Sequence, residues 1–123
     1  MIDTSVVLAF LFDEPGGREA FDTIDRGLMS SVNLSEVLTK CIENSANADF
    51  AEAQVMRLGV TVVPFNTEDA MTAAKLRPLT RNRGLSMGDR ACLALALRYN
   101  LPVLTADRPW AELDVGVDIR LIR

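Results

Sequence analysis

Residues 85–96 read LSMGDRACLALA and place an acidic and a basic side chain at the head of an otherwise apolar helix. Ser86 can cap this helix with its hydroxyl group, and the positive end of the helix dipole favours an anion in the first turn. Taken alone, Asp89 is therefore open to two interpretations, an ordinary first-turn acid or a functional carboxylate. The choice depends on whether other acids converge on it.

The length and composition predict one compact globular domain covering residues 1–123. Hydrophobic residues make up 49% and charged residues 24% of the chain, which is typical of a protein with a packed core. No apolar run reaches membrane-spanning length, and the first residues do not follow the order of a signal peptide. We therefore expect a cytoplasmic protein with no membrane partner.

The chain contains no histidine, which excludes catalysis by Ser-His or Cys-His pairs. Its two cysteines, Cys41 and Cys92, fall within helical patterns and have no neighbouring metal ligand, so we interpret them as small buried apolar residues. An enzyme with this composition has to rely on carboxylates.

The net charge of -4 is unevenly distributed along the chain. Residues 1–72 hold 12 acids and 4 bases, whereas residues 73–123 hold 5 acids and 9 bases. Any single base of the second half is explained by a solvated surface, but as a group they could follow a phosphate backbone or contact a protein partner. The four arginines predicted to do so are Arg81, Arg83, Arg90 and Arg108.

Apolar periodicity and breaker residues predict alternating strands and helices. A very short strand leads into Asp3, and a buried helix of about eight residues follows it. Strands are expected at 28–31, 60–65, 101–107 and 117–122, and helices at 17–26, 34–42, 50–58, 67–77, 86–98 and 108–113. Pro78 is expected to end a helix before a polar loop, and Trp110 to pack the last helix. This alternation predicts a mainly parallel sheet covered on both faces.

Four carboxylates are directed toward one rim of this predicted sheet. Asp3 and Asp107 end strands, and in a parallel sheet such ends share one edge. Glu36 and Asp89 lie in the first turns of helices that begin at that edge. Clustered acids repel one another unless a cation neutralises them, and oxygen-only ligands suit Mg²⁺ or Mn²⁺. A metal so placed can activate water and stabilise the leaving oxygen of a phosphodiester.

Four segments, in order and correctly spaced, resemble PIN domains, specifically the VapC-type toxins of bacterial type II toxin-antitoxin systems. They are DTS at 3–5, SVNLSEV at 31–37, LSMGDRACLALA at 85–96 and LTAD at 104–107. The resemblance implies a PIN-like three-layer α/β/α sandwich and an Mg²⁺- or Mn²⁺-dependent endoribonuclease that forms a homodimer. It also implies a cognate antitoxin whose C-terminal segment lies across the active-site groove.

Matched position by position, the resemblance implies four catalytic acids: Asp3, Glu36, Asp89 and Asp107. All except Glu36 are expected to ligate the metal ion. Small hydroxyl side chains are expected to support the site: Thr4, Ser5 and Thr105.

One departure from the family concerns the first strand. Several apolar residues usually precede the first aspartate, whereas here only Met1 and Ile2 do. Either the native start lies upstream or the central strand is short. A short strand would hold Asp3 less rigidly and bring the free amino group close to the acids, where it could compete with the metal.

Three alternatives were weighed against this assignment. A phosphatase of the haloacid dehalogenase type needs a second aspartate two residues after the first, and Ser5 stands there. A receiver domain needs paired acids before its first strand's aspartate and a late lysine, but the only lysines are Lys40 and Lys75. A catalytically weak or inert PIN fold that only binds RNA or a partner stays open.

Overall fold

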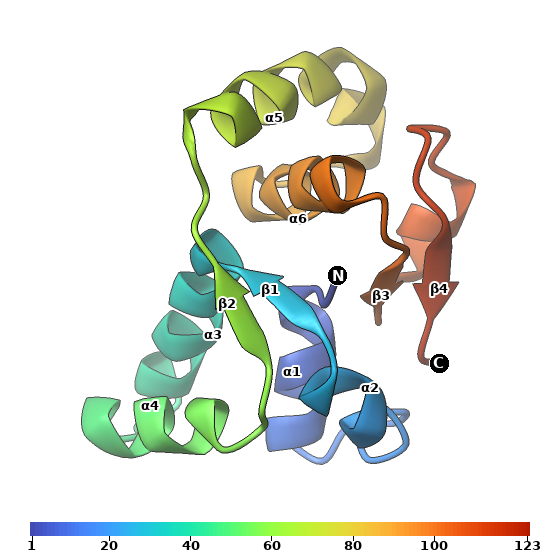
Figure 1. Cartoon of the computed structure of the whole chain (residues 1–123). Helices are drawn as coiled ribbons and strands as arrows, with labels where there is room; N and C mark the ends of the chain where they lie inside the picture. Colours follow the sequence, from blue (N-terminus) through green and yellow to red (C-terminus); the bar gives the residue numbers. More distant parts are fainter.

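The computed structural model describes the whole chain, residues 1–123, as short parallel strands enclosed by helices (Figure 1). Its elements follow in the order α1 (Thr4–Leu11), α2 (Phe21–Asp25), β1 (Leu28–Ser30), α3 (Ser31–Glu43), α4 (Ala48–Met56), β2 (Thr61–Val63), α5 (Thr67–Thr80), the 3₁₀ helix η1 (Arg81–Arg83), α6 (Met87–Tyr99), β3 (Val103–Thr105), the 3₁₀ helix η2 (Arg108–Glu112) and β4 (Ile119–Leu121). None of these helices has both the length and the apolar character needed to cross a membrane.

The strands form two parallel pairs that the first residues of the chain join into one layer. β1 pairs with β2, and β3 pairs with β4. Ile2 forms a parallel bridge to Leu104, and its backbone N–H donates to the carbonyl of Leu28 at 2.7 Å. The spatial order is therefore β2, β1, residues 1–3, β3, β4. The expected parallel sheet is confirmed, although its strands are only three residues long.

The amino terminus lies at the opposite end of this central segment from Asp3. The ammonium group of Met1 donates to the carbonyl oxygen of Pro102 at 2.7 Å, and burial lowers the pKa of that ammonium group. Met1 and Asp3 line different cavities. The expectation that the free amino group would lie close to the acids is therefore wrong, because consecutive strand residues advance by about 3.3 Å each.

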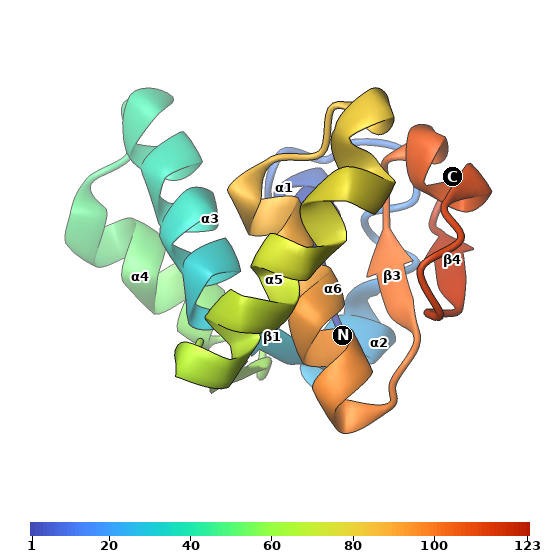
Figure 2. The same cartoon turned by 90° about the horizontal axis from the view of Figure 1, so that it is seen from above.

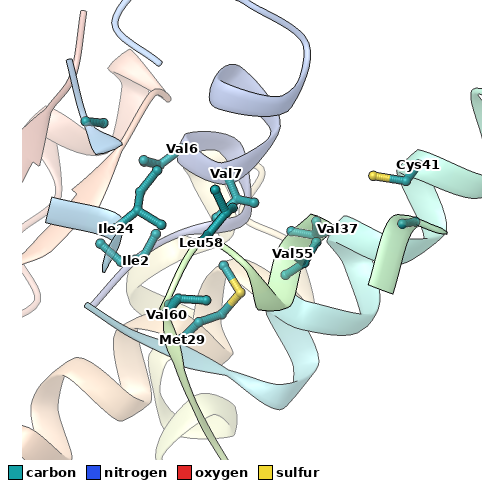
Figure 3. Close-up of a cluster of buried hydrophobic side chains, with 12 residues drawn as sticks. Ile2, Val6, Val7, Ile24, Met29, Val37, Cys41, Val55, Leu58 and Val60 are labelled. Carbon is teal, nitrogen blue, oxygen red and sulfur yellow. The ribbon is translucent and has the colours of Figure 1, made fainter. Parts of the chain in front are cut away.

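Two hydrophobic cores, one on each face of the strands, account for the layers. Successive strand residues point to opposite faces, and the two cores follow this rule. Ile2 and Met29 point into the core shared with α1, α3 and α4, which Figure 3 shows in close-up. Met1 and Val103 point into the other core, with α5 and α6, which pack against each other in Figures 1 and 2. Because the strand side chains alternate between the two cores, helices cover both faces of the strands and form the three-layer α/β/α arrangement.

Several side chains outside the acidic site have the predicted roles. Cys41 and Cys92 are buried and not disulfide-bonded. Trp110 is 2% exposed and packs in the second core, as expected for an aromatic residue that anchors a short helix. These residues need no functional explanation.

The segment after α5 differs from the prediction. The sequence predicts that this helix ends before Pro78, but α5 continues to Thr80 and η1 follows at once. Pro78 lacks a backbone donor, but the helix continues past it, and the hydroxyl of Thr80 donates to the carbonyl of Leu76 at 2.9 Å in the last turn. Arg81 and Arg83 therefore lie on an ordered 3₁₀ turn rather than in a loop.

The helix predicted over 17–26 is also shorter than expected. Gly16 has a φ of 81°, and a Cβ at Gly17 would overlap the backbone of Ala9. The chain is therefore held in tight turns until Ala20, and only α2 is helical. The other predicted helices and strands are present with shifts of their ends.

Candidate active site

The four acids singled out in the sequence line one pocket of about 310 Å³ at the carboxyl-terminal edge of the strands. Ten residues line it, nine of them polar: Asp3, Thr4, Ser5, Leu8, Ser35, Glu36, Thr39, Lys40, Asp89 and Asp107. The acids come from four separate elements, as the parallel topology predicts. The four acids thus lie together, as the sequence predicts.

Asp3 is the most deeply buried acid of this pocket, with 1% of its surface exposed. Its Oδ2 accepts hydrogen bonds from the hydroxyl groups of Ser5 at 2.6 Å and Thr105 at 3.0 Å. Its Oδ1 is buried and has no hydrogen-bond partner. Burial raises the pKa of Asp3 to about 6; the bonds from Ser5 and Thr105 oppose the shift, and the charges of Asp89 and Asp107 add to it. One oxygen of this carboxylate is thus fixed, while the other lacks a partner.

The two hydroxyl groups that hold Asp3 also fix the loop after β3. Ser5 Oγ accepts the backbone N–H of Ala106 at 2.9 Å, and Thr105 Oγ1 accepts that of Asp107 at 3.1 Å. Asp107 itself is exposed, and its side chain does not cap η2. Its carboxylate is therefore available to a ligand, and its backbone is positioned by the same hydroxyl groups that position Asp3.

Glu36 is held by a second polar network. The hydroxyl of Thr4 donates to Glu36 Oε2 at 2.7 Å. Asn33, which is fully buried, places its Nδ2 3.0 Å from Thr4 Oγ1, 3.2 Å from the carbonyl of Gly88 and 3.3 Å from Glu36 Oε2. This amide therefore links α1, α3 and α6 behind the pocket.

Helix α3 begins three residues before the start predicted from the sequence, residue 34. The cap is Ser30, whose Oγ accepts the backbone N–H of Val32 at 3.1 Å, and the helix already begins at Ser31. Because the helix starts earlier than predicted, Asn33 lies inside its first turn and is free for the network around Glu36.

Asp89 is both a first-turn acid that caps its helix and one of the acids that line the pocket. It forms a capping box with Ser86, in which the backbone N–H of Ser86 donates to Asp89 Oδ2 at 2.7 Å. It is also half-buried in the pocket, and burial raises its pKa; the bonds with Ser86 oppose the shift, and the charges of Glu36 and Asp107 reinforce it. No cation pairs with it.

Gly88 provides the space that Glu36 occupies. A Cβ at this position would overlap the Glu36 carboxylate. With glycine before Asp89, the Glu36 carboxylate can keep this position, whereas any larger side chain would require it to move.

The donor set fits a hard divalent cation. Every ligand candidate is an oxygen atom, and the orphaned Oδ1 of Asp3 is a buried acceptor that lacks a positive partner. No three or more His, Cys, Asp or Glu side chains are gathered into a ready-made cage. Mg²⁺ typically keeps several waters and takes only one or two carboxylates from the protein, so it does not need such a cage.

The structure brings none of the four predicted arginines to the lining of this pocket. Arg90 donates to the carbonyl of Ala73 at 3.0 Å and so ties α6 to α5. Arg83 is ion-paired with Glu112. Arg81 and Arg108 are exposed but do not line the pocket. The cation that does line it is Lys40.

A sequence model of the PIN domain family matches residues 1–116. The chain belongs to the PIN domain family. PIN domains are nucleases, and the family generally uses divalent metal ions. A search of curated proteins finds no match.

Solved structures share this PIN fold along nearly the whole chain. A chain of DNA-bound VapBC from Salmonella typhimurium superposes with a TM-score of 0.76 and 22% identity, over 100% of this chain and 97% of that one. VapBC2 from Rickettsia felis, bound to a promoter DNA fragment, gives 0.74 and 14%, over 98% and 96%. FitAcB from Neisseria gonorrhoeae gives 0.67 and 19%, over 96% and 94%. At these identities the likeness establishes the fold.

Sequence reasoning missed three residues of this PIN domain pocket. Asn33 and Gly88 lie inside the motifs that were recognised, but only packing reveals the network of the first and the close approach at the second. Lys40 follows Glu36 by four residues, and this spacing puts both on one helix face. That spacing was the available signal.

Proposed function

We propose that this PIN domain is an Mg²⁺- or Mn²⁺-dependent endoribonuclease and the toxin of a toxin-antitoxin pair. The observation that carries the proposal is Asp3, a buried carboxylate with one unpartnered oxygen in a pocket that three other acids line. Burying a charge without a partner is costly, and natural proteins keep such a feature where a ligand supplies the missing charge.

Asp3, Asp89 and Asp107 are the residues that would hold the ion. A bound divalent cation would lower the pKa of a water and stabilise the charge that develops on phosphate oxygens. Ser5 and Thr105 keep Asp3 oriented, because each donates a hydrogen bond to Oδ2 and leaves Oδ1 directed elsewhere. Glu36, fixed by Thr4, adds negative charge near Asp89 and can accept a proton from an attacking water.

The proposed partners are an RNA substrate, a cognate antitoxin and a second copy of the chain in the cytoplasm. The fold neighbours are chains of VapBC and FitAcB assemblies, which supports an antitoxin partner. Arg81, Arg83 and Arg108 stay candidates for RNA or antitoxin contact on the surface beside the pocket. A neighbouring reading frame for a small DNA-binding protein would favour the toxin assignment over a housekeeping nuclease. Sedimentation of the purified protein tests the homodimer.

A second candidate is a PIN fold that binds RNA or a partner without cleaving. It is favoured by the fact that Asp89 is already engaged by Ser86 and that no metal cage is preformed. The two candidates differ in one observable: the inert module would bind RNA in the presence of Mn²⁺ and leave it intact.

The deciding experiment incubates the purified protein with a mixed RNA substrate with Mg²⁺, with Mn²⁺ and with EDTA. We expect cleavage with either metal, no cleavage in EDTA, and loss of cleavage in Asp3→Asn and Asp89→Asn. Cleavage that persists in EDTA, or that these substitutions leave unchanged, would contradict the proposal.

A further inference from the structure

Lys40 is the cationic side chain that lines the carboxylate pocket. It lies on α3 four residues after Glu36, and therefore on the same face of the helix about 6 Å further along its axis. The other nine lining residues are four acids, four hydroxyl-bearing side chains and one leucine. A phosphodiester that enters this pocket meets four carboxylates and one protein cation.

The pairing of Lys40 leaves it available to a ligand. Its Nζ lies 3.1 Å from Glu43 Oε2, and both side chains are more than half exposed. Exposed pairs of this kind are weak, because water screens both charges. The ammonium group can exchange Glu43 for a phosphate at little cost.

The arginines nearest to the acids in sequence are less suited to this task. Arg90 is tied to the carbonyl of Ala73, and Arg83 is ion-paired with Glu112. Neither these two nor Arg81 and Arg108 line the pocket. The cationic side chain that lines the pocket therefore comes from α3, in the acidic half of the sequence.

We propose that Lys40 binds the phosphate next to the scissile one and so directs a single RNA strand along α3. This inference rests on the proposed nuclease function and adds a substrate-binding residue to it. Neighbouring phosphates of an extended strand are separated by a distance similar to one helical turn, so a phosphate held near Glu36 and Asp89 would place its neighbour at Lys40. A lysine binds such a phosphate as a point charge without reading the base.

The test compares Lys40→Met with Lys75→Met, since these are the only two lysines of the chain. Lys75 is exposed on α5 and does not line the pocket. With an RNA that the wild type cleaves, we expect Lys40→Met to raise KM about tenfold while kcat stays within a factor of two. The salt dependence of kcat/KM should also weaken by one phosphate contact, a slope change of about 0.7. Lys40→Arg should restore both values, and Lys75→Met should change neither.

A second measurement does not depend on cleavage. A short phosphorothioate RNA of mixed sequence is added to the wild-type protein, and the rate of acetylation of each lysine is measured by mass spectrometry. We expect protection of Lys40 and none of Lys75. If the wild type cleaves RNA, an unchanged KM and salt slope in Lys40→Met would overturn the role of Lys40 and leave the proposed function standing. Equal protection of both lysines by RNA, or protection of neither, would do the same. A wild type that neither binds nor cleaves RNA would overturn this inference and the proposed function together.

Discussion

Helices α5 and α6 begin with the same capping motif, but the first-turn acid of α5 is paired with an arginine and that of α6 is not. Asp69 in α5 and Asp89 in α6 each form a capping box, with Asn66 and Ser86 respectively. Asp69 is 1% exposed and paired with Arg98, whose Nε lies 2.9 Å from Oδ1. Asp89 has no arginine and shares a pocket with three other acids.

The difference identifies which buried acid is structural. A carboxylate that serves only the fold has its own cation, because an unpaired buried charge is costly. Asp89 lacks such a partner and its pKa is raised by burial and by neighbouring acids. We infer that the missing cation of Asp89 and Asp3 is the metal ion of the proposed reaction.

The largest expected effect is on catalysis by Asp89→Asn. This change keeps the size of the side chain and one capping acceptor but removes a charge that would hold the metal. We expect kcat to fall about a thousandfold, equivalent to about 4 kcal/mol. The free energy of unfolding in EDTA should stay the same or rise. RNA cleavage assays and urea denaturation on the same preparation measure kcat and the free energy of unfolding. A large loss of stability with unchanged kcat would mean that Asp89, like Asp69, serves the fold and not the site.

Asp69→Asn should lower the stability of the fold and leave catalysis unchanged. Arg98 also donates to the carbonyl of Pro64 at 3.2 Å, so this pair ties the start of α5 to α6. Loss of the charge leaves Arg98 without its carboxylate, and we expect a loss of about 2 to 3 kcal/mol in the free energy of unfolding. Activity per folded molecule should be unchanged. Urea denaturation measures the free energy of unfolding, and RNA cleavage measures kcat per folded molecule. A loss of kcat comparable to that of Asp89→Asn would contradict a purely structural role for Asp69.

The pH dependence of stability tests whether Asp3 is a buried acid without a cation. The pKa of Asp3 in the folded protein is raised from 3.8 to about 6, so its ionised form destabilises the metal-free fold. The free energy of unfolding in EDTA should therefore increase by about 2 kcal/mol as the pH falls from 7.5 toward 4.5, a range that crosses the folded pKa of about 6 and stays above the unfolded value of 3.8. Asp89 shifts in the same direction. In Asp3→Asn most of this increase should vanish. A stability that falls steadily over that range in the wild type would contradict the prediction.

The smallest expected effect concerns Gly88→Ala. In most helices this change stabilises by about 1 kcal/mol. Here the new Cβ overlaps the carboxylate of Glu36, which is the end of a flexible side chain and can move aside. We therefore expect the free energy of unfolding to change by less than about 1 kcal/mol, and cleavage to fall because Glu36 leaves its hydrogen bond with Thr4. Met87→Ala, at the exposed neighbouring position, should leave both unchanged. A stabilised and fully active Gly88→Ala would show that the approach of Glu36 is not required.

The sequence predicted the convergence of the acids better than it predicted what surrounds them. Asp3, Glu36, Asp89 and Asp107 could be placed because parallel topology forces strand ends and helix starts to one edge. The course of α5 through Pro78 could not, because the packing of α5 against α6 favours the longer helix in spite of the lost donor. Such compensation depends on tertiary packing and leaves little trace in residue spacing.

The arginines illustrate the same limit for the candidate site. Charge patterning grouped Arg90 with the acids because it follows Asp89 in sequence, but consecutive helix residues point in directions about 100° apart. Arg90 therefore reaches α5 rather than the pocket. Lys40, from the acidic half of the chain, reaches the pocket because four residues return to the same helix face.

The most direct test of the central claim is Mn²⁺ binding to the wild type, Asp89→Asn and Asp69→Asn, followed by electron paramagnetic resonance without RNA. The account predicts that wild type and Asp69→Asn bind Mn²⁺ with the same affinity, and that Asp89→Asn binds it at least about tenfold more weakly. Equal affinity in all three proteins, or loss of binding only in Asp69→Asn, would contradict the claim that the acid without a cation is the one that holds the metal.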